Sequence, residues 1–128
     1  MDLHSVDNYL LPTDINKVTD WGEGWSWLAG GTWLFSEPQP DITTLVDIQS
    51  LGWDEIEFIN SSHSHQGELL AIGTTCPLIK LIEYPWFSEY IAVEGFKGAI
   101  NALSASLKVV NIATVGGNIC LALSVGTV

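Results

Sequence analysis

The 128-residue sequence predicts an α+β fold, with strands concentrated in its first half and helices in its second. Two short runs in the first half, residues 25–29 and 43–48, are rich in the apolar, aromatic and β-branched residues that favour buried strands. In the second half, apolar residues from Phe96 to Leu107 recur at spacings of three and four, as on one face of a helix. Because strands and helices do not alternate, the pattern disfavours a βαβ series.

The N-terminal part is expected to contain one helix before the first of these strands. A short extended segment ends at Pro12, and the Thr-Asp pair that follows suits the N-cap of a helix over residues 13–22. Ile15, Val18 and Trp21 would form the inner face of this helix. A glycine-containing turn then leads into the strand at residues 25–29.

A pair of strands is expected in the middle of the chain, at residues 53–59 and 68–72. The polar segment between them, residues 60–67, reads as a hairpin loop. It carries His63 and His65, but no carboxylate or third ligand flanks them, so a solvated pair is the favoured interpretation.

Three helical pieces and a final strand are expected after residue 73. The first is capped by Thr74 or Thr75 with Pro77 in its first turn, the second runs over residues 84–93, and the third covers residues 96–107 with Lys108 at its end. The apolar run at residues 119–125 predicts a terminal strand. The resulting architecture is a small mixed sheet followed by helices and a terminal strand.

The composition narrows the classes of partner. Four Lys and no Arg stand against fifteen Asp and Glu, which gives a net charge of −11. Nucleic acids and anionic membranes reward basic surfaces, so neither is expected as a partner. Without a guanidinium group, any phosphate would have to be held by backbone N–H groups and hydroxyls.

The cysteines and the N-terminus give two further expectations. Cys76 and Cys120 are two isolated thiols, whereas a zinc or iron–sulfur site needs about four ligands, so no metal site is predicted. The N-terminus is too polar for a signal peptide, and no apolar run approaches ~20 residues. A cytoplasmic location is therefore the expectation.

Two stretches with adjacent glycines are the most informative local signals. The first lies within residues 27–35 and the second within residues 111–119, and each has a threonine nearby and apolar runs on both sides. Glycine tolerates positive φ and lets backbone N–H groups converge on an anion. Two such stretches indicate two clamps on one diphosphate, although a single Gly-Gly pair is most often an ordinary turn. A Rossmann domain is rejected, because the third glycine of its fingerprint is missing near residue 31.

The motifs in these stretches resemble those of a known family. The first reads Ala-Gly-Gly-Thr at residues 29–32, and the second reads Ala-Thr-Val-Gly-Gly-Asn at residues 113–118. Both are similar to the motifs of the flavoprotein subunit, or flavin domain, of the molybdenum hydroxylases, the family of xanthine dehydrogenase and carbon monoxide dehydrogenase. Segments 45–48 and 70–75 also match the family in order and spacing, and the resemblance extends over the chain from about Tyr9.

The resemblance implies a two-lobed FAD-binding module of the PCMH type, with a first lobe at about residues 1–66 and the start of a second at about 67–128. It implies FAD as cofactor, iron–sulfur and molybdenum-cofactor subunits as partners, and electron transfer through FAD to an acceptor, with no catalytic side chain on this chain. The cofactor-binding residues that it assigns are Leu28, Ala29, Gly30, Gly31, Thr32, Trp33, Leu34, Thr114, Val115, Gly116, Gly117 and Asn118.

Alternatives to this interpretation stay open at the level of the sequence. Thr32 and Thr114 could serve only to stabilise turns, and Asn118 only to accommodate a left-handed backbone. Family members are about twice this length, so a C-terminal remainder is expected to be missing. Together with Ser124 and Thr127 at positions where the family has Pro and Asp, this supports a second hypothesis. It is a truncated, non-catalytic remnant or assembly module that packs on partner subunits without flavin.

Overall fold

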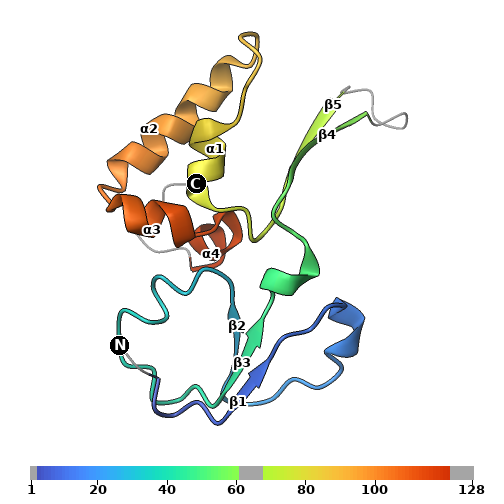
Figure 1. Cartoon of the computed structure of the whole chain (residues 1–128), viewed down its shortest axis with the longest axis vertical. Coiled ribbons are helices and arrows are strands. Elements are labelled where there is room, and N and C mark those ends of the chain that lie inside the picture. The colour runs from blue at the N-terminus through green and yellow to red at the C-terminus, as the bar shows by residue number, and fades with distance from the viewer. Residues whose placement is uncertain (1–2, 61–67, 122–128) are drawn as a thin grey trace.

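The computed structural model of the chain describes residues 3–60 and 68–121. Over these residues it is a small α+β structure, with a strand-rich end and a helix-rich end (Figure 1). The strands are β1 (Asn8–Leu10), β2 (Trp25–Leu28), β3 (Thr44–Asp47), β4 (Ile56–Asn60) and β5 (Glu68–Ile72). The helices are α1 (Leu78–Glu83), α2 (Glu94–Ala102), α3 (Leu107–Ile112) and α4 (Val115–Leu121), with single 3₁₀ turns at Ile15–Lys17, Gln49–Leu51 and Ile91–Val93.

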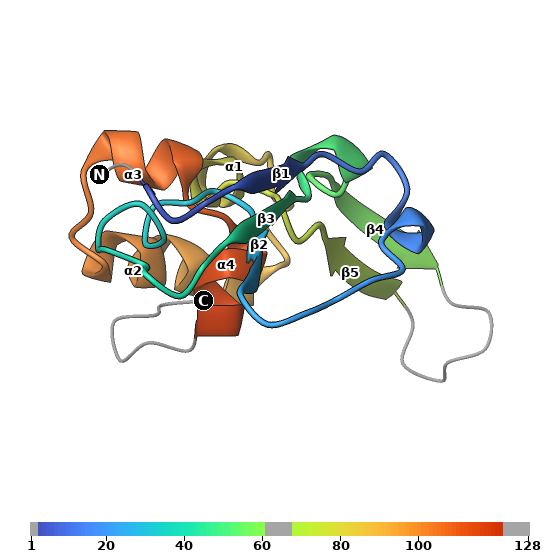
Figure 2. The same cartoon turned by 90° about the horizontal axis from the view of Figure 1, so that it is seen from below.

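The described strands form two separate sheets rather than the single mixed sheet that the sequence predicted. Strands β1, β3 and β2 form a parallel sheet in that order, and β4 pairs with β5 in an antiparallel hairpin. All four residues of the central strand β3 are buried, as expected for a strand with neighbours on both sides. Seen from below, the hairpin lies on one side of the molecule and α2 and α3 on the other (Figure 2).

Two hydrophobic clusters correspond to the two ends of the molecule. The smaller one is formed by the parallel sheet and the turn after β2 and contains Leu28, Leu34 and Leu45. The larger one lies among the helices, and β4 contributes Ile56 to it. The chain therefore passes from one core to the other before the hairpin begins.

A short set of backbone hydrogen bonds joins the start of α1 to the segment before α4. Leu78 N–H donates to Ala113 O at 2.8 Å, and Pro77 and Thr114 form an antiparallel bridge. On the far side of this bridge, Val115 N–H donates to Cys76 O at 2.9 Å. These bonds fix the position of α4 relative to α1, although Pro77 and Thr114 are 114 − 77 = 37 positions apart in sequence.

The predicted helix over residues 13–22 is wrong, because only a single 3₁₀ turn at Ile15–Lys17 forms there. Asp14 does cap this turn, and its carboxylate accepts from Asn16 N–H at 2.9 Å. Trp21 does not face a helix core; its ring stacks on that of Trp27, with the two centroids 4.4 Å apart. Aromatic packing between Trp21 and β2 here prevails over local helix propensity.

Two other predicted elements begin or break differently. The strand expected from residue 53 begins at Ile56, because Trp53 O accepts from Thr75 N–H at 2.8 Å and so takes part in a crossing of two loops. The helix expected over residues 84–93 is absent apart from the turn at Ile91–Val93. Tyr84 is extended, as the residue before a proline prefers, and so α1 ends at Glu83.

The C-terminal part is more helical than predicted. The helix expected over residues 96–107 is two helices, α2 and α3, separated by Ser104 with φ 52°. Ser106 caps α3, so Lys108 lies in the first turn of α3 and not at the C-terminal end of a helix. The predicted terminal strand is wrong as far as Leu121, because α4 runs through these residues; the rest of that strand and the loop with His63 and His65 lie outside the described residues.

Candidate functional site

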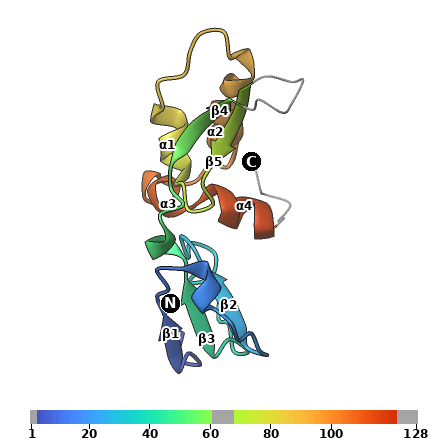
Figure 3. The same cartoon turned by 90° about the vertical axis from the view of Figure 1, so that its right-hand side faces the viewer.

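The two glycine stretches meet in space, although about 80 residues separate them in sequence. A Cβ on Gly30 would lie 2.2 Å from Ile112 O and 3.2 Å from Ala113 Cα. Only a residue without a side chain allows this close backbone contact. Figure 3 shows α3 and α4 directly above the end of the parallel sheet, where this contact occurs.

A cavity of about 650 Å³ lies at this junction. It contains eleven of the twelve residues that the sequence assigned to the cofactor; the exception is Val115, which packs in the helical core. The assigned residues that line it are Leu28, Ala29, Gly30, Gly31, Thr32, Trp33, Leu34, Thr114, Gly116, Gly117 and Asn118. The other lining residues are Ile15, Ser26, Trp27, Ser36, Ile48, Trp53, Thr74, Leu103, Ala105, Val109, Ala113, Cys120 and Leu121.

The first glycine stretch forms a turn with free amides. Gly31 has φ 73°, and its carbonyl accepts from Phe35 N–H at 2.9 Å, which closes one helix-like turn. The N–H groups of residues 30–34 have no hydrogen-bond acceptor within the described part of the chain. Such consecutive unpaired amides at the start of a turn can donate to an anion.

The second glycine stretch is built differently, because it forms the first turn of α4 instead of a loop. Thr114 Oγ1 accepts from Gly117 N–H at 3.1 Å, as an N-cap does, and Thr114 O accepts from Asn118 N–H. Gly116 N–H donates to Thr74 O at 2.9 Å. These amides are occupied within the protein, so this stretch would contact a ligand through side chains.

The threonines and Asn118 have different structural roles in the two stretches. Thr114 does stabilise local structure, as the cap of α4. Asn118 lies inside a helix, and Ser104 is the non-glycine residue with positive φ in the described chain, so a left-handed backbone is the wrong explanation for Asn118. Thr32 lines the cavity, and its hydroxyl makes no hydrogen bond to another described residue.

Two of the glycines have packing reasons that do not involve a ligand. A Cβ on Gly31 would lie 2.6 Å from the Phe35 ring in addition to the strain of its positive φ. A Cβ on Gly116 would lie 2.2 Å from Thr74 Cγ2 and 2.7 Å from Thr74 O. Substitution of either glycine would therefore disturb the fold whether or not a ligand binds.

The electrostatics of the cavity differ from those of the whole chain. None of its lining residues is Asp, Glu, Lys, Arg or His within the described part of the chain, despite the net charge of −11.

Asp47, at the end of β3, accepts a hydrogen bond from Tyr9 Oη at 2.5 Å, and this bond raises the pKa of Tyr9 above its ordinary value. Burial raises the pKa of the Cys76 thiol, whereas Cys120 is exposed at the cavity.

Sequence reasoning missed several residues of this cavity. Trp27 is the first residue of the first glycine stretch, but it is not among the twelve assigned residues. It lines the cavity from β2, and the alternation of two tryptophans on this strand is a signal that could have indicated it. Trp53 and Thr74 reach the cavity through the crossing of loops beside β4 and β5. No local pattern marks Trp53, and Thr74 lies in the family-like segment 70–75 without being assigned to the site.

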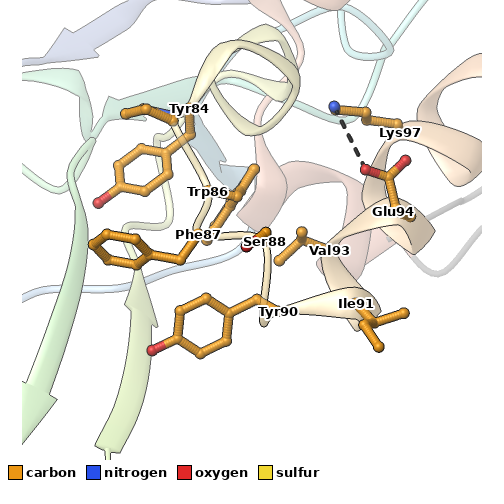
Figure 4. Close-up of a pocket in the computed structure, with 10 residues that line it drawn as sticks. Tyr84, Trp86, Phe87, Ser88, Tyr90, Ile91, Val93, Glu94 and Lys97 are labelled. Atoms are coloured by element: carbon orange, nitrogen blue, oxygen red, sulfur yellow. Dashed lines mark ion pairs between the residues drawn. The ribbon is translucent and has the colours of Figure 1, made fainter.

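A second, smaller cavity of about 370 Å³ lies between the loop after α1 and the start of α2. Figure 4 shows the rings of Tyr84, Phe87 and Tyr90 on one side and the Lys97–Glu94 ion pair, with N and O 3.7 Å apart, on the other. These rings belong to an aromatic cluster that also includes Phe58 of β4. This cavity is separate from the glycine stretches.

The sequence matches no model of a known protein family and no curated protein. Within residues 3–60 and 68–121, no helix has both the length and the apolar character needed to cross a lipid bilayer. The same residues bring together no group of three His, Cys, Asp or Glu side chains able to hold a metal ion.

Proposed function

We propose that this chain binds FAD as the N-terminal portion of a PCMH-type flavoprotein subunit of a molybdopterin-dependent dehydrogenase. In this role it is a cytoplasmic electron-transfer component of an oxidoreductase, and its partners are iron–sulfur and molybdenum-cofactor subunits. Bound FAD supplies the redox chemistry, which passes electrons from the iron–sulfur clusters to an acceptor. The chain itself binds and orients the cofactor.

The observation that supports this proposal most strongly is the meeting of the two glycine stretches at one cavity. Their motifs resemble FAD-contacting motifs, and the two stretches lie against each other at Gly30 and Ile112. The volume of about 650 Å³ is within the range of roughly 300–1,000 Å³ that is usual for cofactor sites. Its apolar walls with a few hydroxyls also fit this class of site.

The residues present fit a diphosphate on one side of the cavity. The free N–H groups of residues 30–34 and the Thr32 hydroxyl would donate to it, which agrees with the absence of Arg from the chain. On the other side, the Thr114 hydroxyl and the Asn118 side chain would supply the second set of contacts. No lining carboxylate opposes the anion in the described residues.

The direct test is to titrate the purified chain with FAD and follow flavin fluorescence, after any cofactor already present has been released with acid. Saturable binding at one FAD per chain is expected. A folded chain that neither carries flavin nor binds added FAD would contradict the proposal.

Replacement of Thr32 by Ala tests the site more locally than replacement of Gly31. Because the Thr32 hydroxyl has no described protein partner, Thr32→Ala should leave the fold intact. Loss of one neutral hydrogen bond should weaken FAD binding about two- to twelvefold. Thr19→Ala, at an exposed threonine away from the cavity, is the matched control and should bind FAD as the wild type does.

A second candidate function is that of an assembly module that packs on partner subunits without flavin. It is favoured by large apolar side chains that lie exposed on the helical end, among them Ile91 (80% exposed), Leu107 (69%) and Phe87 (63%). Such side chains are typical of contact surfaces when they gather in a patch. Co-purification of an iron–sulfur or molybdenum subunit with flavin-free chain would favour this function over FAD binding.

A further inference from the structure

Trp21, Trp25 and Trp27 form a small aromatic cluster, and Trp27 lines the glycine cavity. Trp25 and Trp27 alternate along β2 and therefore point to the same face of the sheet. Trp21 packs on both, with ring centroids 5.6 Å from Trp25 and 4.4 Å from Trp27. The Trp21–Trp27 pair is stacked, with 27° between the ring planes.

Two of these rings are unusually exposed for their size. Trp27 is 46% exposed and Trp21 is 50% exposed, although burying one aromatic side chain removes about 150–250 Å² from water. Trp27 is also part of the cavity wall, and Trp21 is not. Trp21 therefore supports the Trp27 ring, and Trp27 is the member of the pair that a ligand in the cavity would meet.

The position of Trp27 relative to the free amides is fixed by the strand that carries it. Gly30 is only three positions after Trp27, which corresponds to at most about 10 Å of extended chain. In a nucleotide or a flavin nucleotide, a sugar or polyol that spans a similar length joins the planar ring to its phosphate. The ring of such a ligand can thus lie at Trp27 while its phosphate lies at residues 30–34.

We propose that Trp27, held in place by Trp21, is a stacking platform for a planar heteroaromatic ring of the ligand in the glycine cavity. This inference rests on the proposed FAD binding and adds the residue that contacts one of the two rings of FAD. Stacking on an aromatic side chain is tolerant of ring identity, because every such ring offers a π-face. Adenine and isoalloxazine are therefore the two ring sources to be distinguished.

The test is a titration of the full chain with FAD, riboflavin and adenosine, followed by tryptophan and flavin fluorescence. Trp27→Ala should weaken FAD binding about tenfold, as loss of one stacked ring does. Trp27→Phe keeps an aromatic face and should recover most of that affinity. Phe87→Ala removes an exposed aromatic ring that does not line this cavity, and it should leave FAD binding unchanged.

The two smaller ligands identify the stacked ring. If it is the flavin ring, Trp27→Ala weakens riboflavin binding and leaves adenosine binding unchanged; the reverse pattern identifies adenine. Binding of FAD that is equal in wild type and folded Trp27→Ala overturns the platform and leaves the proposed function standing. Absence of FAD binding by the folded wild type overturns both.

Discussion

Replacement of Gly30 by Ala should loosen the contact between the two glycine stretches. The added Cβ would lie 2.2 Å from Ile112 O, whereas ordinary contacts begin near 3.4 Å, so the two backbones must separate by about 3.4 − 2.2 = 1.2 Å. Overpacking of this kind costs about 1–3 kcal/mol, and a carbonyl oxygen cannot turn away as a flexible side chain can. We expect a loss of about 2 kcal/mol of unfolding free energy, or roughly 8 °C in Tm.

Gly98→Ala is the matched control for this prediction. Gly98 lies inside α2, and a Cβ there would meet nothing within 4 Å. The same chemical change should therefore stabilise the protein by about 0.5–1 kcal/mol, since alanine favours a helix more than glycine does. Urea or thermal unfolding followed by circular dichroism measures both variants. Gly30→Ala with wild-type stability would show that the two stretches do not meet as described.

The remaining predictions concern charge, pH and thiol reactivity. FAD binding should strengthen as salt rises, because screening reduces the repulsion between the anionic ligand and a chain of net charge −11; weaker binding at high salt would contradict a site without cationic side chains. The Tyr9–Asp47 bond raises the pKa of Tyr9, so its contribution to stability is full below the ordinary value of 10.0 and is lost as pH rises through the higher folded pKa. Tyr9→Phe should abolish this alkaline loss in unfolding curves measured across that range. An alkylating reagent should label exposed Cys120 in the folded protein and buried Cys76 only after unfolding, and FAD should protect Cys120 because it lines the cavity. Equal labelling with and without FAD would place the ligand elsewhere.

The sequence was informative where a local pattern and the tertiary environment agree. The β-branched run at β3 is a strand with every residue buried, and the α+β class follows from such segments. Of the twelve assigned site residues, the eleven that reach the cavity come from two motifs whose glycines allow close approach. Glycine is required at those positions because the two backbones approach closely there, and such a requirement can be read from a short stretch of sequence.

The errors arose where distant contacts decide the structure. The second glycine pair looks like a loop, but a threonine cap and hydrogen bonds to the segment before α1 make it the first turn of α4. Residues 13–22 have a helical pattern, yet only a 3₁₀ turn forms there, and Trp21 stacks on Trp27 of β2 instead of facing a helix core. The cavity residues Trp53 and Thr74 are placed where the segment before β4 crosses the segment after β5, and the sequence does not show that these two segments meet.

The unequal bonding of the two glycine stretches also determines which part of the chain would lose conformational entropy when a ligand binds. The amides at the start of α4 are fixed by the fold, so this wall of the cavity is already ordered before binding. The turn at residues 30–34 has unpaired amides and contains Gly30 and Gly31, the residue type with the greatest backbone freedom. Ordering one residue costs about 1–2 kcal/mol. The entropy cost of ordering this turn, more than the number of its hydrogen bonds, would therefore set the affinity of the cavity for its ligand.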